Sequence, residues 1–192
     1  MDASFVKSET LTGVALAPLD WARSIGLVVA FSLLTALSAQ IVIPMWPVPI
    51  TGQTFAVLLT GALLGSRLGA AAMIVYLIEG ASGLPFFQQG HGGIAYLLGP
   101  TGGYLVAFPA AAFITGAFAE HGWDKRFFSA AAAMAIGSVL ILLSGWAWLS
   151  FFRSPMFAFH AGVEPFIIGD VIKILLAAAV LPSGWALLRH KR

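Results

Sequence analysis

The sequence predicts an all-α integral membrane protein, a bundle of six membrane-spanning helices whose outer loops are rich in glycine and proline. Three observations lead to this fold class. Of the 192 residues, 59% are hydrophobic and 9% are charged, whereas soluble domains have about 45–50% and about 25%. Three long stretches carry no charge and a fourth carries only two. Nearly all basic residues fall on one side of the bundle that these stretches define.

The same composition excludes several other classes of protein. With so little charge, the chain cannot cover the surface of a soluble domain of this length, and it is too apolar for a disordered chain. It has no cysteine, which excludes a disulfide scaffold. The net charge of +2 offers no basic face for nucleic acid. The expected surroundings are therefore a lipid bilayer, with no nucleic-acid partner.

The first span is predicted over residues 24–43, which carry no charge. Its length matches the roughly 20 residues that cross a hydrocarbon core of about 30 Å. Residues 1–20 lack the apolar stretch and cleavage pattern of a signal peptide. We expect them to form a short cytoplasmic segment, followed by a single membrane domain over residues 21–192.

Residues 54–78 are predicted to form two helices and not one. Arg67 lies near the middle of this stretch, between Gly65 and Gly69. A single span would place Arg67 at the bilayer centre, at a cost of about 2.5–3.5 kcal/mol. A tight turn between two shorter helices avoids this cost. The remaining spans are predicted over residues 104–119, 127–152 and 165–188.

Six spans place eight of the ten basic residues on one side. Arg153 falls in an outer loop and Lys173 lies within the last span. Five spans would put the two basic ends of the chain on opposite sides, against the positive-inside rule. We therefore expect both termini in the cytoplasm. The eight inner residues are Lys7, Arg23, Arg67, Lys125, Arg126, Arg189, Lys191 and Arg192.

Two segments on the expected outer side are unusual for solvated loops. Residues 80–103 have no formal charge and many glycines, and residues 41–53 contain three prolines and a tryptophan. Irregular backbone at membrane depth is tolerated where it is buried in protein or lines a cavity, so we expect these segments to fold back as a lid or plug. Two packed connecting loops with amides facing water are the alternative. All four glutamines lie at this end: Gln40, Gln53, Gln88 and Gln89.

Asp170 and Lys173 are the strongest sign of a binding site. Ionisable residues inside a span are costly and usually face the bundle interior, and the i, i+3 spacing places both on one helix face. The carboxylate can accept N–H donors of a substrate, and the ammonium can donate to a carbonyl or carboxylate. A buried salt bridge that fixes helix register is the alternative. His91, in the glycine-rich loop, is a weaker ligand candidate.

Several chemistries lack their motifs in this sequence. It contains no Gly-x-x-x-x-Gly-Lys-[Ser/Thr] loop for ATP phosphates, no spacing of metal-ligating residues and no Gly-x-Ser-x-Gly nucleophile elbow. We therefore expect no enzyme activity, no metal and no cofactor.

Several segments together resemble one family, the biotin-specific S components (BioY) of energy-coupling-factor (ECF) vitamin transporters. The resemblance extends from about residue 25 to residue 190. Its most specific feature is Gly-Pro-Thr-Gly-Gly-Tyr combined with an intramembrane Asp and Lys. The matching segments are Val-Pro-Ile-Thr-Gly-Gln-Thr at 48–54, Leu-Gly-Ser-Arg-Leu-Gly at 64–69, Gly-Leu-Pro-Phe at 83–86, Gly-Gly at 92–93, Leu-Gly-Pro-Thr-Gly-Gly-Tyr at 98–104, and Gly-Asp at 169–170 with Lys173.

The resemblance implies a substrate, partners and a location. It implies that biotin is transported and binds from outside, beneath the loop between the first two spans. It implies a transmembrane coupling subunit and two ATPase subunits, which would hydrolyse ATP in place of this chain. These partners would dock on small residues of the first helix, here Ser32 and Ala36. The expected location is the inner (plasma) membrane of a bacterial cell.

The chemistry of biotin suggests how the candidate residues would bind it. Its ureido ring has two N–H donors and one carbonyl, which Asp170 and either Lys173 or an amide can match. Its thiophane ring and valeryl chain are apolar and suit Trp46, Phe86 and Tyr104. The other substrate-binding candidates come from the resemblance and the outer loops: Gln53, Gln89, Gly99, Thr101, Gly102 and Gly103.

Two other functions stay open from the sequence. An S component for a different vitamin would share the fold and differ in the pocket, so that riboflavin or thiamine would compete where biotin does not. A membrane assembly protein that transports nothing would use Asp170 and Lys173 as a structural pair. No added ligand would then stabilise it.

Overall fold

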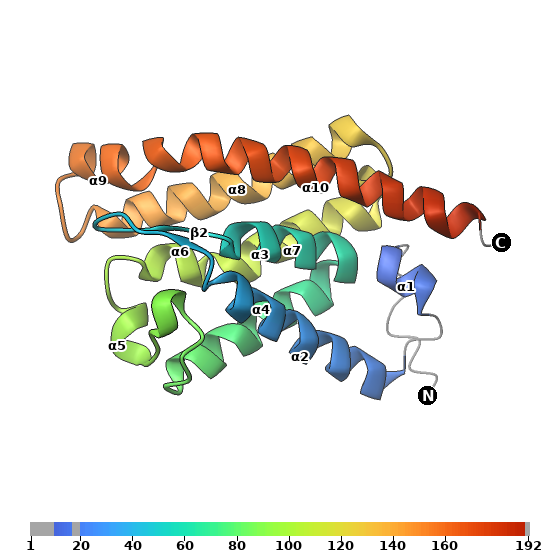
Figure 1. Cartoon of the computed structure of the whole chain (residues 1–192), viewed down its shortest axis with the longest axis horizontal. Helices are drawn as coiled ribbons and strands as arrows, with labels where there is room; N and C mark the ends of the chain where they lie inside the picture. The colour runs from blue at the N-terminus through green and yellow to red at the C-terminus, as the bar shows by residue number, and fades with distance from the viewer. Residues whose placement is uncertain (1–9, 17–19, 191–192) are drawn as a thin grey trace.

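A computed structural model of the chain describes residues 10–16 and 20–190. Over these residues the structure is almost entirely helical, with one short antiparallel pair of strands. The longer helices run along one another as an elongated bundle (Figure 1). The predicted all-α class is therefore confirmed.

The described chain contains ten helices, two 3₁₀ turns and two strands. In chain order they are α1 (Leu11–Ala15), α2 (Trp21–Ser38), β1 (Val42–Ile43), β2 (Ile50–Thr51), α3 (Gln53–Leu64), α4 (Ser66–Ala81), η1 (Gln88–Gly90), α5 (Ile94–Leu97), α6 (Gly102–Val106), α7 (Phe108–Glu120), η2 (Trp123–Lys125), α8 (Phe127–Leu149), α9 (Pro155–Gly162) and α10 (Glu164–His190).

Four helical segments of the described chain are long and apolar enough to cross a membrane: Trp21–Ser38, Gly102–Glu120, Phe127–Leu149 and Pro155–Leu187. The last begins ten residues before the predicted span, because α9 and α10 follow each other almost without interruption. Helices α3 and α4 have 12 and 16 residues. At about 1.5 Å per residue they extend about 18 and 24 Å, less than the hydrocarbon core of about 30 Å.

The turn between α3 and α4 lies where the sequence predicts it. Gly65 has a φ of +87°, which favours glycine, and a Cβ there would lie 2.6 Å from Oε1 of Glu120. The Glu120 carboxylate accepts hydrogen bonds from the backbone N–H of Ser66 at 2.7 Å and from its hydroxyl at 2.9 Å. It thereby caps the start of α4. Arg67 is exposed beside this turn, so the bundle does not bury its charge.

Close backbone contacts hold the centre of the bundle together. A Cβ on Gly61 of α3 would lie 2.3 Å from the carbonyl oxygen of Ala112 on α7, and one on Gly116 of α7 would lie 2.4 Å from backbone atoms of Gly65 and Ser66. Small residues of this kind let membrane helices approach each other closely. Helix α7 therefore lies at the centre, in contact with α3, α4 and α8.

The two ends of the bundle differ in structure and charge. Helix α1 and the end of α10 lie together at one end, here named the α1 end, whereas the β1–β2 hairpin, α5 and α9 lie at the other, the hairpin end (Figure 1). Arg67 near the start of α4, Lys125 in η2 and Arg126 just before α8 lie at the α1 end, and Arg153 lies at the hairpin end. The described basic residues therefore follow the predicted asymmetry.

A buried carboxylate joins the α7–α8 connection to α10 at the α1 end. Asp124 of η2 is 2% exposed, and its Oδ2 accepts a hydrogen bond of 2.6 Å from the indole N–H of Trp185. Its Oδ1 is buried and has no hydrogen-bond partner among the described residues. Burial raises the pKa of the Asp124 carboxyl because desolvation disfavours the charged form.

Candidate substrate-binding site

Two adjoining cavities lie at the hairpin end. The inner one has a volume of about 30 Å³ and the outer one about 300 Å³. They share four lining residues, Pro49, Gln88, Tyr96 and Thr101, which we call the neck. The rest of the inner lining is Val48, Thr51, Gln53, Thr54, Tyr104, Leu105, Phe108, Phe166 and Lys173. The rest of the outer lining is Pro44, Met45, Pro47, Gln89, His91, Ala95, Gly99 and Pro100.

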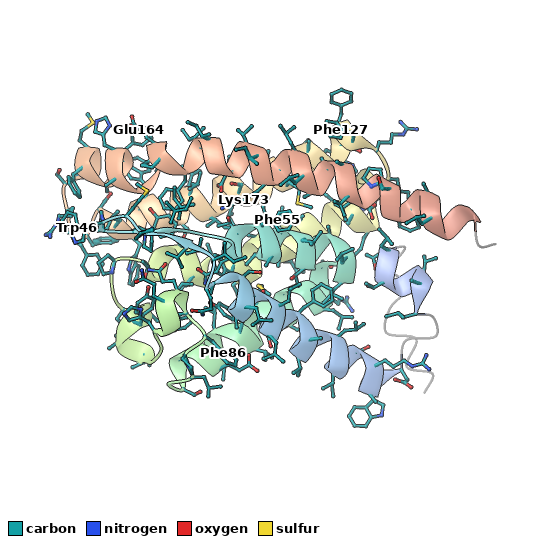
Figure 2. The ribbon with its side chains drawn as sticks, viewed as in Figure 1. Trp46, Phe55, Phe86, Phe127, Glu164 and Lys173 are labelled. Carbon is teal, nitrogen blue, oxygen red and sulfur yellow. The ribbon has the colours of Figure 1, made fainter. Side chains whose placement is uncertain are left out.

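Lys173 brings its ammonium group to the inner cavity from α10, within the bundle (Figure 2). Its Nζ donates to the carbonyl oxygen of Thr51 at 2.9 Å, to the hydroxyl of Thr54 at 2.8 Å and to Oδ1 of Asp170 at 3.3 Å. An ammonium group has three N–H donors, so each has an acceptor. The charge of Lys173 is paired and its donors are saturated.

Asp170 lies behind Lys173 and outside the lining of the inner cavity. It is 5% exposed. Its Oδ2 accepts a hydrogen bond from the hydroxyl of Ser138 on α8, and the Thr54 hydroxyl lies 3.5 Å from Oδ1. The structure thus places Asp170 beside Lys173, as predicted. In contrast to the prediction that the Asp170 carboxylate contacts the ligand, it bonds to Lys173 and Ser138 and does not line the cavity. A buried ion pair persists when such additional hydrogen bonds offset its desolvation.

Gln53, the first residue of α3, continues the polar network toward the outer loops. Its Oε1 accepts from the Thr51 hydroxyl at 2.8 Å, and its Nε2 donates to the hydroxyl of Tyr76 on α4. The Tyr76 hydroxyl in turn donates to the carbonyl oxygen of Phe86 at 3.1 Å. The amide keeps one N–H and one acceptor lone pair for another group.

Aromatic residues form one wall of the inner cavity. Tyr104 and Phe166 stack at 5.9 Å with an interplanar angle of 18°, and both are buried. The Tyr104 hydroxyl donates to the carbonyl oxygen of Gly162 at 2.7 Å, where α9 ends. The predicted candidate Tyr104 therefore lines the cavity with its ring and fixes the α9–α10 junction with its hydroxyl.

Tyr96 is a neck residue with unused hydrogen-bonding capacity. Its ring stacks on Phe87 at 5.4 Å and on His91 at 5.0 Å. Its hydroxyl lies beside Thr101 and Gln88 but is buried without a hydrogen-bond partner in the described chain. Burial raises the pKa of this hydroxyl, which keeps it protonated and able to donate.

Some of the other candidates in the glycine-rich loop line a cavity, and others allow close packing of the backbone. Thr101 belongs to the neck, and Gly99 and Gln89 line the outer cavity. Gly102 and Gly103 line neither: a Cβ on Gly103 would lie 2.1 Å from that of Trp148, and one on Gly102 would lie 1.8 Å from the carbonyl oxygen of Leu97. These two glycines allow close packing around the start of α6.

Both outer segments fold back over the bundle, as their composition predicts. The hairpin segment, residues 41–53 with the β1–β2 pair, contributes Val48, Pro49 and Thr51 to the inner cavity. The glycine-rich segment is held by Gln40, whose Nε2 donates to the carbonyl oxygen of Phe87 at 3.1 Å and whose Oε1 accepts from the backbone N–H of Gly90 at 3.0 Å. Gln40 therefore holds a loop in place and does not line either cavity.

Trp46 and Phe86 lie outside both cavity linings, in contrast to the prediction that they contact the apolar part of a ligand. The hairpin turns Trp46 outward, so that it is 69% exposed, meets the Phe157 ring edge-on at 5.9 Å and lies 5.4 Å beneath the Arg153 guanidinium. Figure 2 shows Trp46 at the end of the bundle. Phe86 contributes its carbonyl oxygen to Tyr76. The apolar lining comes instead from Val48, Leu105, Phe108 and Phe166.

Sequence reasoning missed several polar residues of this site. The residues not among the predicted candidates are Thr51, Thr54, Tyr76, Tyr96 and Ser138. A signal existed for Thr54 and Ser138, because hydroxyl side chains inside membrane helices hydrogen-bond across helices. Which of the chain's many such hydroxyls do so depends on the packing.

Ser32 and Ala36, expected from the resemblance to dock a partner, are buried at 0% and 6% exposure. Helix α2 turns this face toward α3 and α4, and the neighbouring Thr35 hydroxyl contacts the sulfur of Met73 on α4. A partner helix cannot reach them in this structure. The exposed small residues of α2 are Ala22, Gly26 and Ala30.

Membrane-length apolar helices, folded-back loops and an enclosed polar and aromatic cavity define a multi-pass membrane protein that binds a small solute. In the described residues no three His, Cys, Asp or Glu side chains gather as a possible metal site. A model of the BioY family matches residues 7–190, and the chain belongs to this family.

Named relatives and a solved structure agree with this membership. The chain is 42% identical to a "Probable biotin transporter BioY" of Pyrococcus horikoshii over 83% of this chain and 94% of the relative. It is 37% identical to the "Biotin transporter BioY" of Thermotoga maritima over 78% and 88%. Its structure resembles the crystal structure of the S-component for biotin from an ECF-type ABC transporter, with a TM-score of 0.76 and 26% identity, over 84% of this chain and 90% of the other.

Proposed function

We propose that this chain is the biotin-binding S component of an ECF transporter, which takes biotin from outside the cell for uptake driven by partner subunits. The observation that carries the proposal is the inner cavity, in which a paired Lys173 and the Gln53 amide face stacked aromatic rings. Its lining suits a neutral polar head with an apolar body, the combination that biotin offers. Membership of the BioY family supports the same substrate.

The ureido head would bind beside Gln53 and Lys173. A cyclic urea presents donors and an acceptor side by side, and the free N–H and lone pair of the Gln53 amide are complementary to them. Asp170 then acts through Lys173, whose position and charge it fixes. The thiophane ring would pack on Tyr104 and Phe166.

Binding requires the lining to move. A volume of about 30 Å³ holds one or two water molecules, at about 15–30 Å³ each, and is far smaller than biotin. The hairpin segment, which supplies Val48, Pro49 and Thr51 to the lining, is the part that would shift. Its two strands pair over two residues each, so little backbone pairing resists the movement.

The proposed arrangement in the membrane has six spans, with α3 and α4 as the short ones and the α1 end in the cytoplasm. The charge asymmetry supports this orientation, because Arg67, Lys125 and Arg126 lie at the α1 end and cytoplasmic loops carry an excess of Lys and Arg. The proposed location is the cytoplasmic membrane. The resemblance found in the sequence favours the membrane of a bacterial cell.

A transmembrane coupling subunit and two ATPase subunits are the proposed partners. Because the sequence lacks a P-loop, ATP hydrolysis is assigned to the ATPases. Docking would use the exposed stripe of α2 formed by Ala22, Gly26 and Ala30, where small side chains allow close helix approach. Ser32 and Ala36 would support this face from inside the bundle.

Thermal unfolding of the purified protein in detergent, with and without biotin, tests the proposal. At 100 times its dissociation constant, a ligand stabilises by about 2.7 kcal/mol. We expect this shift to disappear in Lys173→Ala and Gln53→Ala. Protein freed of biotin that shows no shift would refute biotin as the ligand. A shift with riboflavin or thiamine would then identify another vitamin, and silence across the vitamins would favour an assembly protein.

A further inference from the structure

The two cavities differ in the charged groups that they offer to a ligand. In the inner cavity Lys173 is the one charged group among the described lining residues, and its three donors already have acceptors. The described lining of the outer cavity contains amides, prolines and His91, but no acidic residue and no Lys or Arg. Its volume of about 300 Å³ is ten times that of the inner cavity.

This difference sets the direction of a bound biotin. A ligand carboxylate at Lys173 would have to displace Asp170 or share the ammonium with it. Two carboxylates and one ammonium in a buried place leave a net negative charge, which burial penalises. The ureido head carries no charge and avoids this cost. The carboxyl end therefore points away from Lys173, through the neck and into the outer cavity.

At the neck the carboxyl end meets neutral hydrogen-bonding groups. The Tyr96 hydroxyl is buried and unpartnered in the described structure, and Gln88 and Thr101 lie beside it. These groups can donate to an amide carbonyl oxygen as they can to a carboxylate oxygen. Replacing the ligand carboxylate by an amide costs no ion pair here, because the described outer lining contains no lysine or arginine to form one.

We propose that the outer cavity accepts groups joined to the carboxyl of biotin through an amide, so that biotin amides, including ε-N-biotinyl-lysine, are substrates of this protein. The inference rests on the proposed function and extends it. The inner cavity selects the ureido head, and the outer cavity tolerates a group attached to the carboxyl carbon. The space beyond the neck is large enough for the lysyl group.

Competition against labelled biotin on the purified full chain tests this substrate class. We expect biotinamide and ε-N-biotinyl-lysine to bind within 10-fold of biotin, whereas diaminobiotin, which lacks the ureido carbonyl, loses more than 100-fold. Failure of biotinyl-lysine to compete while biotin binds would overturn the inference and leave the proposed function standing. Absence of biotin binding would instead refute the proposed function.

A variant that fills the outer cavity tests whether the lysyl group binds there. Ala95 is exposed and lines only the outer cavity of the two, so Ala95→Trp should lower the affinity for biotinyl-lysine at least 10-fold more than that for biotin. Ala147, exposed on α8 outside both linings, is the matched control, and Ala147→Trp should change neither affinity. An equal loss of both ligands in Ala95→Trp would place the lysyl group elsewhere and contradict the inference.

Discussion

Removal of the Asp170 carboxylate should destabilise the ligand-free protein strongly. Asp170→Ala leaves the partly buried Lys173 ammonium without its anion and removes the acceptor of Ser138. Breaking a buried pair by removing one partner costs about 3–5 kcal/mol. Lys173 keeps two of its three acceptors, on Thr51 and Thr54, so we expect about 3 kcal/mol, the lower end. At about 2–4 °C per kcal/mol for a chain of this length, Tm should fall by about 6–12 °C.

Thermal unfolding in detergent without biotin measures this loss. A second substitution tests whether the loss comes from the unpaired charge of Lys173. The double variant Asp170→Ala with Lys173→Met leaves no unpaired charge, so it should be more stable than Asp170→Ala alone. The exposed pair of His160 and Glu164, 2.8 Å apart near the start of α10, is the control, because Glu164→Ala should cost less than about 1 kcal/mol. Two outcomes would show that the pair is not a coupled unit. Either Asp170→Ala unfolds at the same temperature as the wild type, or the stability lost in the double variant equals the sum of the losses in Asp170→Ala and Lys173→Met.

Three further changes test the rest of the structure, each by thermal unfolding of the purified protein. Tyr76→Phe leaves Gln53 without its acceptor and should cost about 1–3 kcal/mol, as well as weaken biotin binding through a misplaced amide. Gly65→Ala places a Cβ against Glu120 at a φ of +87° and should cost at least about 1 kcal/mol. Burial raises the pKa of Asp124 above its usual 3.8, so the folded state favours the neutral acid, and its stability relative to Asp124→Asn should fall as pH rises from about 4.

Each of these expectations has an outcome that contradicts it. Unchanged Tm and biotin affinity in Tyr76→Phe would show that the Gln53 amide needs no acceptor. A stable Gly65→Ala would show that the α3–α4 turn adapts to a Cβ. Parallel pH profiles of wild type and Asp124→Asn would show that the carboxyl titrates alike in the folded and unfolded chain.

The parts of the fold that charge and backbone chemistry decide were predictable from the sequence. Arg67 could not stay at the bilayer centre, and a glycine beside it could supply the left-handed turn, so the break between α3 and α4 followed. Asp170 and Lys173 had to face each other inside the bundle. The apolar, glycine-rich outer segments had to fold back onto protein.

The choice of side chains that line the cavity was not predictable in the same way. Trp46 is apolar and close in sequence to the lining, yet the hairpin turns it toward Phe157. Tyr96 lines the neck because α5 is held against Phe87, a contact between distant elements. Ser32 faces inward because α2 packs with this face toward α3 and α4. Such directions depend on tertiary packing, which composition and spacing do not encode locally.

The saturation of Lys173 also links binding to closure of the hairpin. One of its three acceptors is the carbonyl oxygen of Thr51, at the end of the segment that we propose to move on binding. Opening that segment would take the acceptor away and leave a partly buried N–H of a charged group unpaired, at a cost of about 1.5–3 kcal/mol for such a bond. A ureido carbonyl placed beside Lys173 supplies an acceptor at the same point. An apolar ligand of the same shape cannot, so we expect the site to discriminate between ligands by the groups that they leave unpaired as well as by those that they contact.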